Sequence, residues 1–246
     1  MLRLFSLAAT AATLAFAPAA GLGSATPALP VHAAIAPVQA PARLTVEAQL
    51  GMNADGHDHE SGLAPKQTAD DFEAWLNRSP TNRAQAMAFR DYLAARGVVA
   101  VVPIWQLTRT SSSWKECGAQ PFEIPPQHLW DRIITTLKFV RDDVVPSVGA
   151  VEPLSAYRNA GLNACSNGAP KSAHREFFAV DLTPVNKNLD RTAMIRSVCA
   201  AHARDGRDYN TGLGFYTGRR FHVDSSGFRK WGADGKGATS PCVTQA

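Results

Sequence analysis

The stretch that decides the fold of this chain is Phe221-His222-Val223-Asp224. It follows Gly212-Leu213-Gly214-Phe215-Tyr216 and precedes Arg229-Lys230-Trp231. Within it, apolar Phe221 and Val223 alternate with polar His222 and Asp224. An alternation of period two is typical of a strand that buries one face and leaves the other open. The neighbouring glycines indicate turns between short strands. We therefore expect a small, mainly antiparallel sheet here, with His222 and Asp224 on one face.

Upstream of this sheet the sequence predicts helices. Apolar residues recur at helical spacing, and the segments that carry them end at Gly or Pro. A β-branched run after the second of these segments predicts a strand. Helices followed by a sheet indicate an α+β fold in which N-terminal helices (residues 69–148) pack on a small, mainly antiparallel sheet (residues 149–246). The expected helices are 71–76, 82–96, 127–144 and 191–204, and the expected early strand is 98–104.

The N-terminus has the pattern of an export signal. Residues 1–20 combine Arg3, a mainly apolar run and a small-residue end at 17–20, which is typical of a cleaved signal peptide. The apolar run is too short for a membrane anchor, which needs roughly 20 residues. We therefore expect a periplasmic or secreted protein with no stable membrane insertion after signal cleavage. Residues 21–68 are rich in Ala and Pro and predict a flexible linker.

Charge and cysteine content narrow the class of protein further. The formal net charge of +4 is spread along the 246 residues without a long basic run, so we expect no nucleic-acid partner. The length fits one compact domain with tails, and we expect a monomer.

The four cysteines are Cys117, Cys165, Cys199 and Cys242. In an exported chain they predict two disulfides, which can be paired in three ways.

Two histidines and one aspartate are the candidate metal ligands. Catalytic zinc usually takes three protein ligands from His, Asp, Glu and Cys and keeps a fourth position open. If His174 lies in the loop entering a strand that ends at Asp181, both can face one side of the sheet, and an adjacent strand brings His222 to them. Arg158 adds a planar guanidinium that suits a carboxylate. A metal ion next to an arginine that can bind a carboxylate is the arrangement that a carboxypeptidase needs.

Three segments in this order resemble the zinc D-Ala-D-Ala carboxypeptidase family, a member of the LAS-type metallopeptidases that also include murein endopeptidases. They are Ser155-Ala156-Tyr157-Arg158 with Asn163, Ser172-Ala173-His174 with Ala179-Val180-Asp181, and the glycine-rich, Phe221–Asp224 and Arg229–Trp231 pieces quoted above. The resemblance covers about residues 149–231 and implies that residues 149–246 form the metallopeptidase core. It implies that His174, Asp181 and His222 bind Zn²⁺. It also implies that Arg158 acts in catalysis by binding the substrate's terminal carboxylate or a nearby carbonyl, and that Ser172 supports the site by hydrogen bonding.

Two positions depart from the pattern of that family. The family usually has Gly three residues after the first histidine, where this chain has Phe177, and Gly commonly marks a close backbone approach or a special dihedral angle. The family also has an acidic residue or a histidine shortly before the last ligand as general base, but residues 216–221 contain neither. Asp224 is the best substitute, either as a catalytic base or as a support for His222. Glu176 is a weaker candidate for either role.

The resemblance therefore implies a hydrolase: an exported zinc metallopeptidase that cleaves peptide bonds in peptidoglycan stem peptides of the cell wall. It leaves open whether the enzyme acts as a carboxypeptidase or as an endopeptidase, and the sequence also allows a peptidase with the same metal that acts on ordinary protein substrates. The alternative is a cell-wall-binding module on the same fold that has lost catalysis, because Phe177 and the missing base are both departures from the enzymes.

Overall fold

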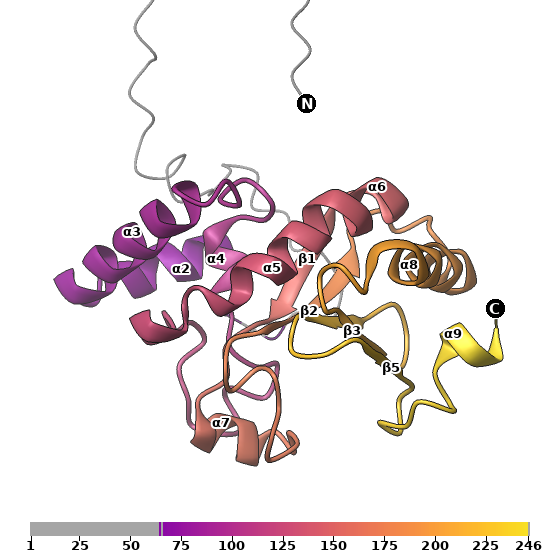
Figure 1. Cartoon of the computed structure of the whole chain (residues 1–246). Coiled ribbons are helices and arrows are strands. Elements are labelled where there is room, and N and C mark those ends of the chain that lie inside the picture. Colours follow the sequence, from indigo (N-terminus) through magenta and orange to yellow (C-terminus); the bar gives the residue numbers. More distant parts are fainter. Residues whose placement is uncertain (1–63, 65, 246) are drawn as a thin grey trace, which may run out of the picture. The chain divides into compact units, whose positions relative to one another are not determined.

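A computed structural model describes residue 64 and residues 66–245 (Figure 1). These residues form an α+β fold in which helices come first and a five-stranded mixed sheet follows. Before the sheet lie α2 (Ala69–Leu76), α3 (Pro80–Ala94), α4 (Ile104–Leu107), the 3-10 turn η1 (Gln127–Leu129), α5 (Arg132–Phe139), the π-helical turn η2 (Val140–Val144) and α6 (Val145–Val148). The remaining elements are β1 (Val151–Ser155), α7 (Ala160–Cys165), β2 (Ala179–Pro184), α8 (Arg191–Asp205), β3 (Gly212–Phe215), β4 (Phe221–Asp224), β5 (Arg229–Trp231) and α9 (Pro241–Thr244).

The predicted signal peptide (1–20) and most of the predicted linker (21–68) lie outside the described residues. The end of that linker is corrected, because Gln67 is buried and bonded to the helical part. Its side chain donates to the carbonyl of Pro121 at 2.8 Å, and its own carbonyl accepts a hydrogen bond from Nε of Arg109 at 2.9 Å. The chain is thus anchored at Gln67, just before the cap of α2.

The predicted N-terminal helices are confirmed, and their capping residues show why they start where they do. Thr68 and Asp71 form a capping box in which each side chain accepts from the other residue's backbone N–H, and this arrangement satisfies two otherwise unpaired donors. Ser79 caps α3, and Pro80 follows in its first turn, where a missing N–H costs nothing. Gly97 adopts a φ of +69° just beyond the end of α3, a conformation that glycine reaches without strain.

The predicted strand at residues 98–104 is wrong. These residues form turns, and α4 begins at Ile104 after Pro103. The backbone N–H of Val98 bonds to Leu93 and that of Val101 bonds to Val98, so the segment makes local contacts and joins no sheet. Its β-branched side chains are buried instead, since Val98, Val102 and Ile104 belong to the hydrophobic core.

The predicted long helix at residues 127–144 is present but continues past Pro146. The turn η2 widens the helix over Val140–Val144, and α6 then runs to Val148 with Pro146 in its first turn. Pro146 has no N–H to donate to the preceding helical turn, and the widened turn η2 lies directly before it. The helix ends at Gly149, whose φ is +79°.

The sheet has the strand order β1-β2-β4-β3-β5. All neighbouring pairs are antiparallel except β3 and β5, which are parallel, so the predicted mainly antiparallel sheet is confirmed. In Figure 1, α5 crosses over the sheet, and it contacts β2 and β4. Val180, Leu182 and Val223 are buried in one hydrophobic cluster with the helices. By the alternation of strands, Asp181, His222 and Asp224 therefore lie on the other face.

All four cysteines are paired in two disulfides, as expected, and the structure selects one of the three pairings. Cys117 joins Cys165 at the end of α7, and Cys199 of α8 joins Cys242 of α9. Paired cysteines are typical of proteins from oxidising compartments. Across the described part of the chain, every helix is too short or too polar to cross a membrane.

Candidate metal centre

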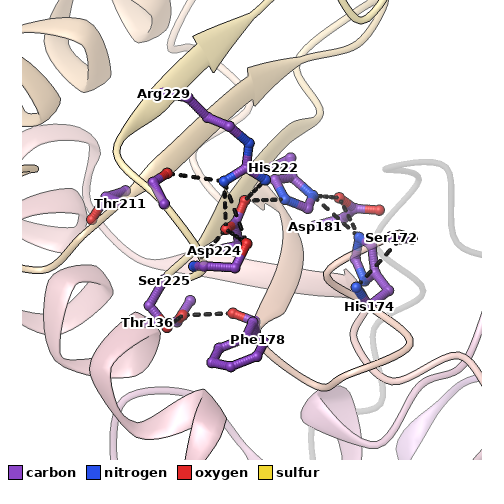
Figure 2. Close-up of polar contacts among 12 residues, drawn as sticks. Thr136, Ser172, His174, Phe178, Asp181, Thr211, His222, Asp224, Ser225 and Arg229 are labelled. Atoms are coloured by element: carbon purple, nitrogen blue, oxygen red, sulfur yellow. Dashed lines mark hydrogen bonds and ion pairs between the residues drawn. The ribbon is translucent and has the colours of Figure 1, made fainter. Parts of the chain in front are cut away.

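His174, Asp181 and His222 come together on the sheet, as the sequence predicts (Figure 2). His174 lies in the turn before β2, while Asp181 and His222 face each other across the β2–β4 pair. β2 runs on to Pro184 instead of ending at Asp181, which places Asp181 in mid-strand directly beside His222. All three side chains are almost completely buried.

Three ligand atoms form a nearly equilateral triangle. Nε2 of His174 lies 3.2 Å from Oδ1 of Asp181 and 3.2 Å from Nδ1 of His222, and Nδ1 of His222 lies 3.1 Å from Oδ1 of Asp181. Ligands at about 2.0–2.1 Å from a tetrahedral zinc lie roughly 3.3 Å from one another. The three residues therefore fit a small tetrahedral cation with three protein ligands.

The outer hydrogen bonds of the two imidazoles fix which nitrogen carries the proton. Nδ1 of His174 lies 2.6 Å from the carbonyl oxygen of Ala156; because a carbonyl only accepts, Nδ1 must donate. Nε2 of His222 similarly donates to Oδ2 of Asp224 at 2.8 Å. In the neutral rings, the inner nitrogens then carry lone pairs. Two lone pairs and a carboxylate oxygen thus face one another, an arrangement that a bound cation stabilises.

The pKa values of the two histidines are shifted in opposite directions. Burial and the nearby charge of Arg158 lower the pKa of His174 to about 4, so this ring is neutral at neutral pH. Burial also disfavours a charged His222, but hydrogen bonds with Asp181 and Asp224 outweigh it and raise the pKa of His222. A cation bound at the three ligands would take the place of that proton.

Asp181 is held by two further side chains. Its Oδ2 accepts a hydrogen bond from Nη2 of Arg220 at 2.5 Å, and its Oδ1 accepts one from the hydroxyl of Tyr216 at 3.0 Å. Burial opposes ionisation of Asp181, but the neighbouring His174 ring and the Arg220 guanidinium hold its pKa well below the usual value. Burial and the charge of Asp181 raise the pKa of Tyr216, so its hydroxyl remains a donor.

A pocket of about 480 Å³ opens beside the two histidines. Arg158 and Ser172 line it together with His174 and His222, so the structure brings both predicted substrate-binding residues to the centre. The backbone N–H of His174 donates to Oγ of Ser172 at 3.3 Å, which is the kind of support expected of Ser172. Nε of Arg158 is buried with no hydrogen-bond partner among the described residues.

Asp224 lies behind His222 and does not line this pocket. Besides His222, it accepts hydrogen bonds from Ser226 and from both terminal nitrogens of Arg229, and it is fully buried. Burial alone would raise its pKa, but the hydrogen bond and charge of His222, together with Arg229, lower that pKa strongly. Of the two roles left open by the sequence, these contacts favour support of His222. Glu176 is exposed and paired with Arg132.

Phe177 occupies the position where a glycine was expected, and its backbone is that of a glycine. Its φ is +57°, which costs a residue with a side chain roughly 1–2 kcal/mol. The ring is fully buried and packs against Phe89 and Tyr157. Burial of an aromatic side chain, worth about 1.5–3 kcal/mol, offsets this strain.

No family model, curated protein or solved structure matches this chain. The function must therefore be inferred from the geometry of the centre.

Three contributors to the site were given no role from the sequence: Tyr216 and Trp231, which belong to the quoted motifs, and Arg220, which belongs to none of them. Arg220 lies two residues before His222, so the same alternation that places His222 and Asp224 on one face could have placed Arg220 there too. Trp231 lines the pocket and contacts the rings of Tyr216 and His222. Gly214 makes room for it, because a Cβ there would overlap the indole.

Proposed function

We propose that this protein is an exported zinc-dependent peptidase that cleaves peptide bonds in peptidoglycan stem peptides. The observation that carries the proposal is the convergence of Nε2 of His174, Oδ1 of Asp181 and Nδ1 of His222 beside an open pocket. Two imidazoles and one carboxylate are a ligand set that zinc uses in catalytic sites. When bound, zinc polarises a substrate carbonyl and lowers the pKa of a water molecule.

The residues around the centre would bind and orient a peptide. Arg158 offers donors for the terminal carboxylate or a nearby carbonyl of the substrate, and Trp231 adds an apolar wall to the same pocket. Ser172 and Ala156 fix the His174 ring through its backbone and its Nδ1. Asp224 orients His222, as partners of ligand histidines commonly do.

The two disulfides support the proposed location. Both form within the part of the chain that follows the predicted signal peptide, and such bonds persist in the periplasm or outside the cell. Under this proposal the signal is removed and the protein acts in the periplasm or after secretion.

The test is metal analysis of the purified protein, together with the products released from defined muropeptides with and without a chelator. His174→Ala should lose both zinc and product release, because a single missing ligand weakens a three-ligand site severely. His128→Ala is the matched control, since His128 is exposed on η1 and lies outside the three-ligand group. A His174→Ala variant that folds and keeps full turnover would defeat the proposal.

A second candidate function is a cell-wall-binding module without catalysis. It is favoured by one observation: among the described residues that line the pocket, none is an Asp or Glu that could serve as general base. Retention of the protein on purified sacculi with no new peptide termini by mass spectrometry would identify the binder, whereas new termini that disappear with a chelator would identify the enzyme.

A further inference from the structure

A second pocket adjoins the metal centre through Arg229. It has a volume of about 600 Å³ and lies between α8, β5 and α9. Its walls include Ile195, Phe228, Pro241 and the disulfide between Cys199 and Cys242. Arg229 lines this pocket as well as the pocket at the metal centre, so the two pockets share a wall at the outer strand of the sheet.

The charged side chains along both pockets have one sign. Arg158, Lys171 and Arg229 line the first, and Arg196, Arg207, Arg229 and Lys230 line the second. We call these six residues the basic track. No Asp or Glu accompanies them among the described lining residues, although the chain as a whole has 21 acidic residues against 25 Lys and Arg. The overall composition therefore does not explain why the charged residues that line both pockets are all basic.

Two residues of the basic track already have internal partners. The guanidinium of Arg229 is bound to Asp224, and that of Arg207 lies 4.4 Å from the centre of the Phe228 ring. Arg196 and Lys230 are exposed and form no ion pair within residues 66–245. The charges of Arg196 and Lys230 are therefore available to a partner in solution. The apolar walls between them suit uncharged parts of the same partner.

We propose that the basic track binds an extended anionic strand, namely the part of the wall polymer that continues beyond the peptide held at the metal centre. This inference rests on the proposed function and makes it more specific: the substrate is a peptide still attached to a carboxylate-bearing polymer. The chemistry required is a strand with carboxylates at intervals and apolar groups between them, running past Arg229 from one pocket to the other.

The test uses the full, zinc-loaded protein and compares two charge-matched double variants. Arg196→Glu/Lys230→Glu alters the basic track, while Lys138→Glu/Lys187→Glu makes the same change in charge at exposed lysines that line neither pocket. Binding to purified sacculi is measured by sedimentation over a range of salt concentrations. Release from a short free muropeptide is measured separately.

The track variant should bind sacculi roughly tenfold more weakly and with a smaller salt dependence, because two attractive contacts become repulsive. It should retain the hydrolysis of the short peptide, and the control variant should bind as the unaltered protein does. Equal loss in both variants, or wild-type binding by the track variant, would overturn the inference. Equally tight binding of the unaltered protein to a DNA duplex would also overturn it, since it would show a general polyanion site. Absence of peptide release in every protein would count against the proposed function and leave the binding comparison to decide the track.

Discussion

The carboxylate of Asp181 shows how a single residue can be prepared for a metal. Its Oδ1 faces the two imidazoles, while its Oδ2 is bound by Arg220. With one oxygen occupied, Asp181 can offer only the other to a cation. A single carboxylate oxygen beside two nitrogens suits zinc, whereas larger hard cations prefer more oxygen ligands, often including a bidentate carboxylate.

Arg220→Gln should therefore weaken zinc binding by about 10–100-fold, the usual effect of removing a partner of a metal ligand. The physical reason is that Asp181 loses the charge that lowers its pKa and the contact that fixes its orientation. Competition with a chromogenic chelator measures the dissociation constant. Arg219→Gln is the control, because Arg219 bonds to the carbonyls of Asn186 and Leu189 and not to Asp181. Equal zinc affinity in both variants would show that Arg220 has no such role.

At this scale the sequence predicted the ligands, and named Ser172 and Asp224 as supports, but did not predict the residues that hold Asp181. The spacing of His174 and Asp181 and the alternation around His222 allowed the three side chains to share one face, and the family resemblance selected them as ligands. Tyr216 reaches Asp181 from beyond the end of β3, in the turn leading to β4. No periodicity predicts such a contact. The positive φ of Phe177 was indicated by the departure from glycine, but the burial of its ring depends on Phe89, which is distant in sequence.

At the scale of elements, the short strands β3 and β5 build the wall of the site through two glycines. Gly212 and Gly214 lie in register with Arg229 and Trp231 of β5. A Cβ on Gly212 would overlap Asp224 and Arg229, and a Cβ on Gly214 would overlap Trp231. Because these two glycines leave one face of β3 without side chains, Asp224 of β4 and Arg229 and Trp231 of β5 can lie close against that face.

Gly214→Ala should displace the Trp231 indole and destabilise the protein by about 1–3 kcal/mol, the cost of overpacking a closed contact. Since Trp231 lines the pocket, peptide release should fall as well. Urea unfolding and muropeptide turnover check the two effects. Gly161→Ala is the control: the new Cβ would make only an ordinary 3.6 Å contact, with Oδ1 of Asn159, inside α7. If Gly214→Ala were as stable and active as that control, the packing of Trp231 on β3 would be irrelevant.

Helices were easier to predict than the early strand. The helices at 71–76, 82–96 and 191–204 carry their own capping residues or a regular apolar pattern, so local information was sufficient. The segment at 98–104 has the composition of a strand, but its backbone N–H groups bond locally and it joins no strand of the sheet, although α4, which begins at Ile104, packs against β1. Whether a partner is available is a tertiary property that composition does not contain.

For the whole molecule, the two disulfides close loops of nearly the same size at different sites. Their sequence separations are 48 and 43 residues. The loop-entropy relation gives about 4 kcal/mol of stabilisation for each, with a difference of only about 0.1 kcal/mol. Cys165 is followed directly by Ser166 and Asn167, which line the pocket at the metal centre. Cys199 and Cys242 line the second pocket and tie α9 to α8.

Replacing each disulfide by two alanines should therefore give similar losses of stability but different losses of function. Cys117→Ala/Cys165→Ala should raise the KM for a short muropeptide, because the loop after Cys165, which lines the pocket at the metal centre, is no longer held in place. Cys199→Ala/Cys242→Ala should leave that KM nearly unchanged and reduce retention on sacculi, because α9 no longer closes the pocket of the basic track. Urea unfolding at a fixed temperature establishes the common loss of about 2–4 kcal/mol, and the two functional measurements are made where both variants remain folded. Identical functional losses would mean that the disulfides act only through global stability, and that the two pockets are not shaped separately.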